Sequence, residues 1–186
     1  MTNNDTSLIS PTNPTRLFCH YLHQLKIILA KIEAHSGSSV DTNNGKVALL
    51  QQSLQPGMLP LIAQIRTAVN FSLRACCPLS NRPRINFDNA SETYAGLQQQ
   101  LDETIAYLQA IPEADFKQGP NRITDTAGFR TLDLSREEYL NCYALPNFFF
   151  HINMAYAIAR AAGVPLSKGD FDGYHQYPDG FSFVEK

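Results

Sequence analysis

The chain has 186 residues and a mass of 20.7 kDa, which is long enough for one domain with its own hydrophobic core. Only 17% of the residues are charged and the formal net charge is -2, so the chain lacks the positive field that binds nucleic acid or anionic membranes. No segment has the ~18 consecutive apolar residues of a membrane span, and the N-terminus has no secretion-signal pattern. We therefore expect a soluble, cytoplasmic protein that does not bind nucleic acid or membranes.

Four segments have the apolar periodicity of amphipathic helices. The first begins at Asn13-Pro14, a capping residue followed by a proline that needs no hydrogen bond there. The last begins at Ser135 with an S-x-x-E capping box and ends before Gly163. Pro146 lies inside this last helix and predicts either a kink or two helical segments. The four predicted helices are residues 13–35, 60–78, 89–112 and 135–162.

Between the third and fourth helices, residues 121–134 alternate with a period of two and predict a β-hairpin that turns at Ala127-Gly128. Residues 35–46 have the composition of a loop, and a short helical turn is expected at 47–54. The predicted fold is all-α, a four-helix bundle with a small hairpin between helices three and four. We divide the chain into a flexible segment at 1–14, the bundle at 15–173 and an aromatic tail at 174–186, which packs on the bundle or on a partner subunit.

His151 is the main candidate site residue, because it shares one face of the last helix with Asn147 and with small apolar residues. A buried imidazole needs a hydrogen-bond partner or a metal. Two interpretations remain open: a core histidine that fixes packing, or a ligand or catalytic base. His35 ends the first helix, where it either interacts with the helix dipole or contributes to a polar site.

Other residues on the helices are expected to face solvent or a partner. The helical wheel places His20 and His23 on the outer face of the first helix. In the last helix, Phe149 lies about 160° from His151 and is the ring of the Phe-Phe-Phe run that we expect to be exposed. The chain contains no G-x-S-x-G, H-E-x-x-H, P-loop or G-x-G-x-x-G motif.

One stretch carries a family resemblance: Ala-Leu-Pro-Asn-Phe-Phe-Phe-His at 144–151, followed by Ala155-Tyr156 and by the segments 163–168 and 170–171. It resembles a bacterial family of unknown function in the DinB/YfiT-like superfamily, and weaker agreement extends over residues 15–173. The resemblance implies an up-down-down-up bundle that is often a homodimer. Some superfamily members bind a divalent metal through three histidines, and some are thiol-dependent transferases or isomerases.

Few residues of the superfamily metal sites have a counterpart in this sequence. His151 and His35 match histidines of the family. Superfamily metal sites take two histidines four residues apart from the last helix, but here Asn147 and Ala155 flank His151 at that spacing, and the second helix has no histidine. At two further positions, Asn70 and Gly57, relatives carry aspartate.

A bound zinc or nickel ion would need nitrogen or sulfur ligands. The available set is His151, Cys142 and Cys76. Cys142 lies about 180° from His151 on an ideal helix, so a kink at Pro146 would have to bring it round. The remaining cysteines are expected to be reduced core thiols.

These observations leave three functional hypotheses. The favoured one is a DinB-like protein that binds an unknown small molecule at a polar site around His151, Asn147 and His35, with no assignable reaction. The second is a thiol-dependent transferase in which His151 and Cys142 hold a divalent metal. The third is a structural or interaction module that acts as a homodimer.

Overall fold

The computed structural model of the protein describes residues 13–37, 48–178 and 181. Residues 48–50 are helical, and the other elements follow in chain order. None of the described helices is long and apolar enough to cross a membrane. The elements are α1 (Thr15–Gly37), α3 (Leu61–Leu79), α4 (Tyr94–Gln109), α5 (Glu113–Lys117), β1 (Arg122–Ala127), β2 (Arg130–Ser135), α6 (Arg136–Glu138), the π-helical η1 (Tyr139–Ala144), α7 (Leu145–Ala161) and α8 (Lys168–Asp172).

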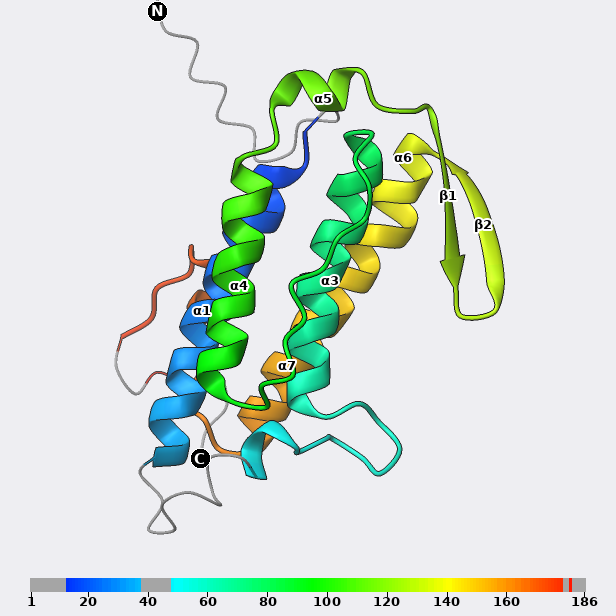
Figure 1. Cartoon of the computed structure of the whole chain (residues 1–186). Helices are drawn as coiled ribbons and strands as arrows, with labels where there is room; N and C mark the ends of the chain where they lie inside the picture. The colour runs from blue at the N-terminus through cyan, green and yellow to red at the C-terminus, as the bar shows by residue number, and fades with distance from the viewer. Residues whose placement is uncertain (1–12, 38–47, 179–180, 182–186) are drawn as a thin grey trace, which may run out of the picture.

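The four long helices α1, α3, α4 and α7 form a bundle, with α3 against α7 and α1 against α4 (Figure 1). Helices α1 and α7 run in one direction and α3 and α4 in the other, because the connection at residues 80–93 returns along the bundle before α4 begins (Figure 1). The all-α fold with a hairpin between the third and fourth long helices is therefore confirmed.

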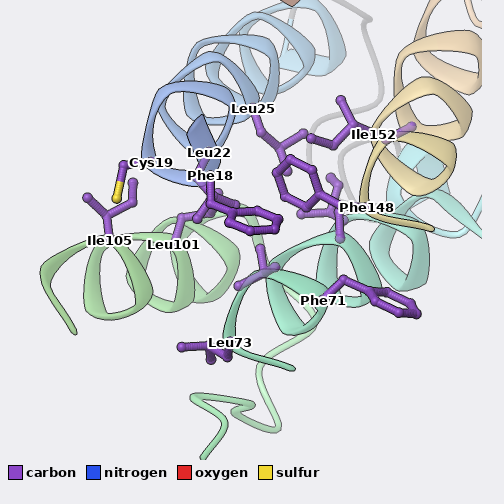
Figure 2. Packing of buried hydrophobic residues seen from close by; sticks show 14 of the residues in the cluster. Phe18, Cys19, Leu22, Leu25, Phe71, Leu73, Leu101, Ile105, Phe148 and Ile152 are labelled. Atoms are coloured by element: carbon purple, nitrogen blue, oxygen red, sulfur yellow. The ribbon is translucent and has the colours of Figure 1, made fainter. Parts of the chain in front are cut away.

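The core lies where one apolar stripe of each long helix meets the others (Figure 2). On α1 the fully buried stripe includes Phe18, Leu22 and Leu25, which the helical period places on one face. Phe18 meets Phe148 of α7 edge to face, with ring centroids 4.8 Å apart. This contact stabilises the packing of α1 against α7, since aromatic pairs in this geometry attract one another beyond the burial of their area.

The expectation that Phe149 faces solvent is wrong. Its half-buried ring packs edge to face against Tyr21, with centroids 4.7 Å apart. The exposed ring of the run is Phe150, which retains 53% of its accessible surface. A single buried stripe does not describe α7, because α3 contacts it on the side of His151 while Tyr21 of α1 covers Phe149.

The third long helix begins at Tyr94 and not at Asn89 as predicted. The Thr93 side chain caps it by accepting a hydrogen bond from the Gly96 amide at 3.1 Å. Asn89 instead holds the preceding loop, since its Oδ1 accepts from the Ser91 amide and its Nδ2 donates to the Gly96 carbonyl. Local side-chain hydrogen bonds of this kind compete with helix formation, so the cap falls four residues later.

The last long helix begins with the predicted capping box, in which the Ser135 and Glu138 side chains bond each other's backbone amides. Next to Pro146 the helix divides into segments, which is one of the two predicted alternatives. The π-helical η1 precedes α7, and Pro146 occupies the first turn of α7, where a proline leaves no hydrogen bond unmade. Gly163, with φ +87°, follows the helix as predicted.

The predicted hairpin consists of β1 and β2, which pair antiparallel from Arg122–Ser135 to Ala127–Arg130. Its turn is Gly128-Phe129 and not Ala127-Gly128. Gly128 has φ +60°, and a glycine at the first central position is typical of two-residue type II′ turns. Phe129 is consequently fully exposed at the tip.

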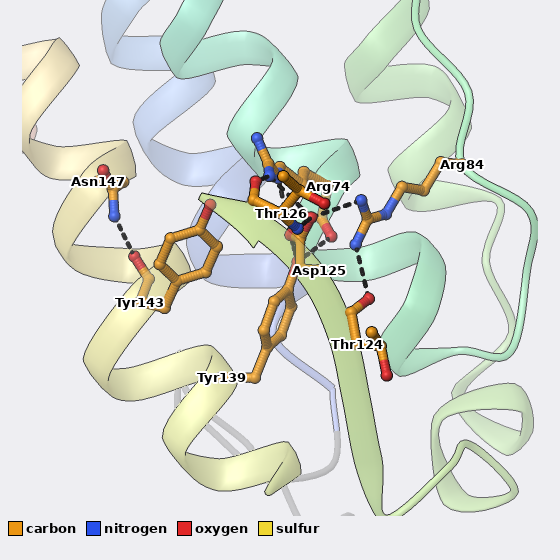
Figure 3. A network of polar contacts seen from close by, with 8 residues as sticks. All are labelled: Arg74, Arg84, Thr124, Asp125, Thr126, Tyr139, Tyr143 and Asn147. Carbon is orange, nitrogen blue, oxygen red and sulfur yellow. Dashed lines mark hydrogen bonds and ion pairs between the residues drawn. The ribbon is translucent and has the colours of Figure 1, made fainter. Parts of the chain in front are cut away.

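A buried carboxylate joins the hairpin to the bundle (Figure 3). Asp125 of β1 accepts hydrogen bonds from Arg74 Nε and Nη2 at 2.7 Å each and from Arg84 Nη1 at 2.6 Å. The hydroxyl of Tyr139 lies 2.8 Å from the same carboxylate and 2.8 Å from the Arg74 carbonyl. Burial alone would raise the pKa of Asp125, but the hydrogen bonds from Arg74, Arg84 and Tyr139 lower it well below its usual range.

The end of the described chain folds back on α1. His20 is half-buried and not solvated as expected: its Nε2 lies 2.8 Å from the Asp172 carbonyl, and its ring stacks on Tyr174. The Asp172 carboxylate accepts bonds from the amides of Tyr174 and His175 and from the His175 ring, and its pKa falls to about 2 although burial would raise it. The predicted segments at 1–14 and 35–46 lie mostly outside the described residues.

Loss of the Asp125 carboxylate should destabilise the fold. We expect Asp125→Asn to lower the free energy of unfolding by about 2–3 kcal/mol, less than for a fully buried pair because both arginines are partly solvated. Urea denaturation followed by circular dichroism measures this. The control is Asp133→Asn, which removes an exposed carboxylate paired with Arg122 and should change little. Equal effects of the two variants would contradict the assignment.

The same carboxylate predicts a pH dependence. Because the folded pKa of Asp125 is lowered, its contribution is present above the unfolded pKa of ~3.9 and is lost as the pH falls through that value toward the folded pKa. Urea midpoints between pH 7 and pH 3 should fall more steeply for the wild type than for Asp125→Asn. Parallel curves would show that Asp125 does not contribute.

Candidate functional site

His151 lies half-buried on α7 and its ring faces α3. Its Nδ1 is 2.7 Å from Oε1 of Gln64, a buried residue in the first turn of α3. The antiparallel packing of α3 and α7 brings these residues together although 87 positions separate them.

A second hydrogen bond, on the side away from His151, fixes the orientation of the Gln64 amide. Its Nε2 donates to the carbonyl of Leu59 at 3.3 Å, so Oε1 is the atom that faces the imidazole. Because a carbonyl oxygen only accepts, Nδ1 of His151 carries the proton and Nε2 carries the lone pair. In the described part of the chain, no hydrogen bond reaches Nε2.

Aromatic rings define the rest of the site. Phe71 of α3 stacks on the imidazole, with centroids 5.7 Å apart and an interplanar angle of 20°. Phe150 meets it edge to face at 5.2 Å and is exposed to solvent. Burial lowers the pKa of His151, because it disfavours the charged imidazolium. The site therefore presents a neutral, oriented imidazole between a buried ring and an exposed one.

The other predicted polar residues do not join His151. Asn147 is half-buried, and its Nδ2 donates to the backbone carbonyl of Tyr143 at 2.7 Å (Figure 3). His35 is exposed in the last turn of α1, near Gly163 at the far end of α7. Since ten residues separate His151 from Ala161, about 15 Å of helix lies between them. The structure thus contains a His151–Gln64 site, with His35 and Asn147 elsewhere.

The donor set proposed for a metal does not fit one. Cys142 is exposed and Cys76 is fully buried, so η1 does not turn the Cys142 thiol into the bundle interior. Burial raises the pKa of Cys76 well above its usual value and disfavours the thiolate that binds metals. No group of three or more His, Cys, Asp or Glu side chains that could hold a metal occurs among the residues that the structure describes. We derive no metal chemistry for this site.

Sequence reasoning missed Gln64 and Phe71 as site residues. A signal for Gln64 was present: it falls on the apolar face of the second helix with Leu61, Ile65 and Ala68. A glutamine inside an apolar stripe needs a hydrogen-bond partner. Its partner could not be named because the register between α3 and α7 comes from packing.

Residues 14–172 match a domain of unknown function, DUF1993. The chain belongs to the DUF1993 family. It is also similar to the crystal structure, at 1.83 Å resolution, of a DinB family member from Shewanella denitrificans. That similarity has 28% sequence identity and a TM-score of 0.73, and covers 88% of this chain and 92% of the other. The search of curated proteins finds no match for this DUF1993 protein.

The lowered pKa of His151 predicts acid sensitivity. Its contribution to stability is present above the unfolded pKa of ~6.5 and is lost as the pH falls through that value, because the unfolded imidazole binds the proton more readily. Urea denaturation at pH 7.5 and pH 5.5 should show a larger loss for the wild type than for His151→Gln. The control His35→Gln changes an exposed histidine and should keep the loss of the wild type. An unchanged pH dependence in His151→Gln would contradict the prediction.

Proposed function

We propose that this DUF1993 protein binds a small molecule through Nε2 of His151. The observation that carries the proposal is the neutral imidazole whose Nδ1 proton is directed to Gln64 and whose Nε2 has no hydrogen bond within the described residues. A lone pair held in this way accepts a hydrogen bond from a ligand, and the ligand does not have to reorient the ring. Pre-organisation of this kind lowers the cost of binding.

The surroundings favour a ligand with a flat apolar part. Phe150 is exposed beside the imidazole, and Met58 and Leu59 are exposed in the loop whose Leu59 carbonyl holds Gln64. Exposed apolar side chains around a few oriented polar atoms are typical of binding sites. We infer a ligand that donates one hydrogen bond to Nε2 and places an apolar ring or chain near Phe150.

Phenol is a suitable probe, since it carries one hydroxyl donor on an aromatic ring, and anisole is its matched control without the donor. Two-bond 1H–15N NMR spectra of the imidazoles should show a saturable shift of His151 Nε2 with phenol and a smaller one with anisole. His151→Leu should abolish the response of the site, and His35→Leu should keep it. No saturable shift, or equal shifts with both compounds, would overturn the proposal.

Gln64→Leu tests the orientation of the ring. We expect the His151 signals to change from one tautomer to a mixture, because the acceptor for Nδ1–H is lost, and the phenol affinity to fall by about fivefold. The same NMR spectra report both effects. A single unchanged tautomer in this variant would show that Gln64 does not fix the imidazole.

The alternative hypothesis, that the protein is an interaction module acting as a homodimer, has less support than small-molecule binding. The tail residue Tyr174 stacks on His20 of the same chain, and Phe149 is covered by Tyr21, so these two rings make contacts within one chain. Homodimer formation stays a prediction. Light scattering of the full chain and of a chain truncated after Gly173 would detect a dimer held by the tail.

A further inference from the structure

The ring of Phe71 connects His151 to a second polar residue, Tyr143 of η1. Phe71 stacks on the imidazole with centroids 5.7 Å apart, and it meets the Tyr143 ring edge to face at 5.9 Å. Figure 2 shows that Phe71 points away from Phe18 and Leu22, toward the outer side of α3. The interface of α3 with α7 and η1 therefore carries His151 and Tyr143 on either side of one shared aromatic ring.

The hydroxyl of Tyr143 is a hydrogen-bond donor that the described structure does not use. The side chain is half-buried, and its hydroxyl makes no hydrogen bond to any residue that the structure describes. In Figure 3 this hydroxyl points toward Arg74, whereas the hydroxyl of Tyr139, one turn earlier, is bonded to Asp125. Burial raises the pKa of the Tyr143 hydroxyl, so the group is protonated at neutral pH and can donate to a ligand.

The surroundings of Tyr143 carry a positive charge. The guanidinium of Arg74 lies 5.6 Å from the centre of the Tyr143 ring. Arg74 and Arg84 both bind the one carboxylate of Asp125, and neither pairs with a second carboxylate among the described residues. The three side chains together thus keep one positive charge, although both guanidinium groups are hydrogen-bonded. This charge attracts an anion at the Tyr143 hydroxyl without breaking either ion pair.

The two ends of this surface therefore select opposite groups. Nε2 of His151 accepts a hydrogen bond, Tyr143 donates one beside a positive charge, and the rings of Phe71 and Phe150 lie next to the imidazole. We propose that the ligand of the His151 site is an aromatic hydroxy acid, whose hydroxyl donates to His151 and whose carboxylate accepts from Tyr143. This inference rests on the function proposed above and adds the ligand class and the residue that recognises its anionic end.

The probe is 3-(4-hydroxyphenyl)propanoate, and 3-(4-hydroxyphenyl)propanamide is a neutral control of the same shape. Titrations of the full chain, followed by the NMR shift of His151 Nε2, should show about fivefold tighter binding of the propanoate, because hydrogen bonds to charged groups are stronger. Tyr143→Phe should remove this preference and leave the affinity for the propanamide nearly unchanged. Tyr174→Phe removes a hydroxyl from the exposed tail and should keep the preference.

The outcomes separate this inference from the function on which it rests. If phenol and the propanamide bind but the propanoate binds no more tightly, the ligand class is wrong and the His151 site stands. If none of the three compounds shifts His151, both proposals fail. An unchanged preference in a folded Tyr143→Phe, or equal losses in Tyr143→Phe and Tyr174→Phe, would also overturn the inference.

A second variant tests the charge without altering Tyr143. Arg84→Gln removes one of the two guanidinium groups, and Asp125 keeps its pair with Arg74. We expect the affinity for the propanoate to fall to that of the propanamide, because the excess positive charge is gone. Circular dichroism shows whether the variant is folded. A preference for the propanoate that persists in folded Arg84→Gln would contradict the role of the charge.

Discussion

Antiparallel packing of α7 against α3 is the interaction on which the rest of this structure depends. It buries Phe148 and Ile152 in the core and at the same time places His151 against Gln64. A side chain that faces a neighbouring helix just outside the core is partly shielded from water, which lowers the pKa of the imidazole and strengthens its hydrogen bond. The candidate site is therefore a consequence of the helix interface and not an addition to it.

The hairpin depends on the same helix pair. A two-stranded hairpin is marginal by itself, and its apolar contribution here is small, since Ile123 is its main buried side chain. The Asp125 carboxylate compensates by joining β1 to Arg74 of α3 and to Tyr139 of η1. The Asp125 carboxylate is buried against the side chains of Arg74, Arg84 and Tyr139. It favours one position of the hairpin on the bundle, because any other position would leave the buried charge unpaired.

Several helix ends could be predicted from the sequence, because they depend on local interactions. The capping box at Ser135 and the glycine stop at Gly163 both depend on contacts within a few residues. The apolar period predicted four long helices, and the change to a period of two predicted the hairpin. Where local signals competed, as at Asn89 and Thr93, the boundary moved, because two capping residues lay within reach of one helix start.

The site itself was predicted only in part. That His151 lies on the inner side of its helix follows from the helical period, and this much was determined by the sequence. Its partner Gln64, the outward turn of Cys142 and the distance to His35 were decided only by tertiary structure. The physical reason is that the helical period gives the angle of a side chain about its own axis, whereas the residue it meets depends on how far two helices slide along each other. That register between α3 and α7 is set by the packing of their buried side chains in the common core, which no segment of the chain contains alone.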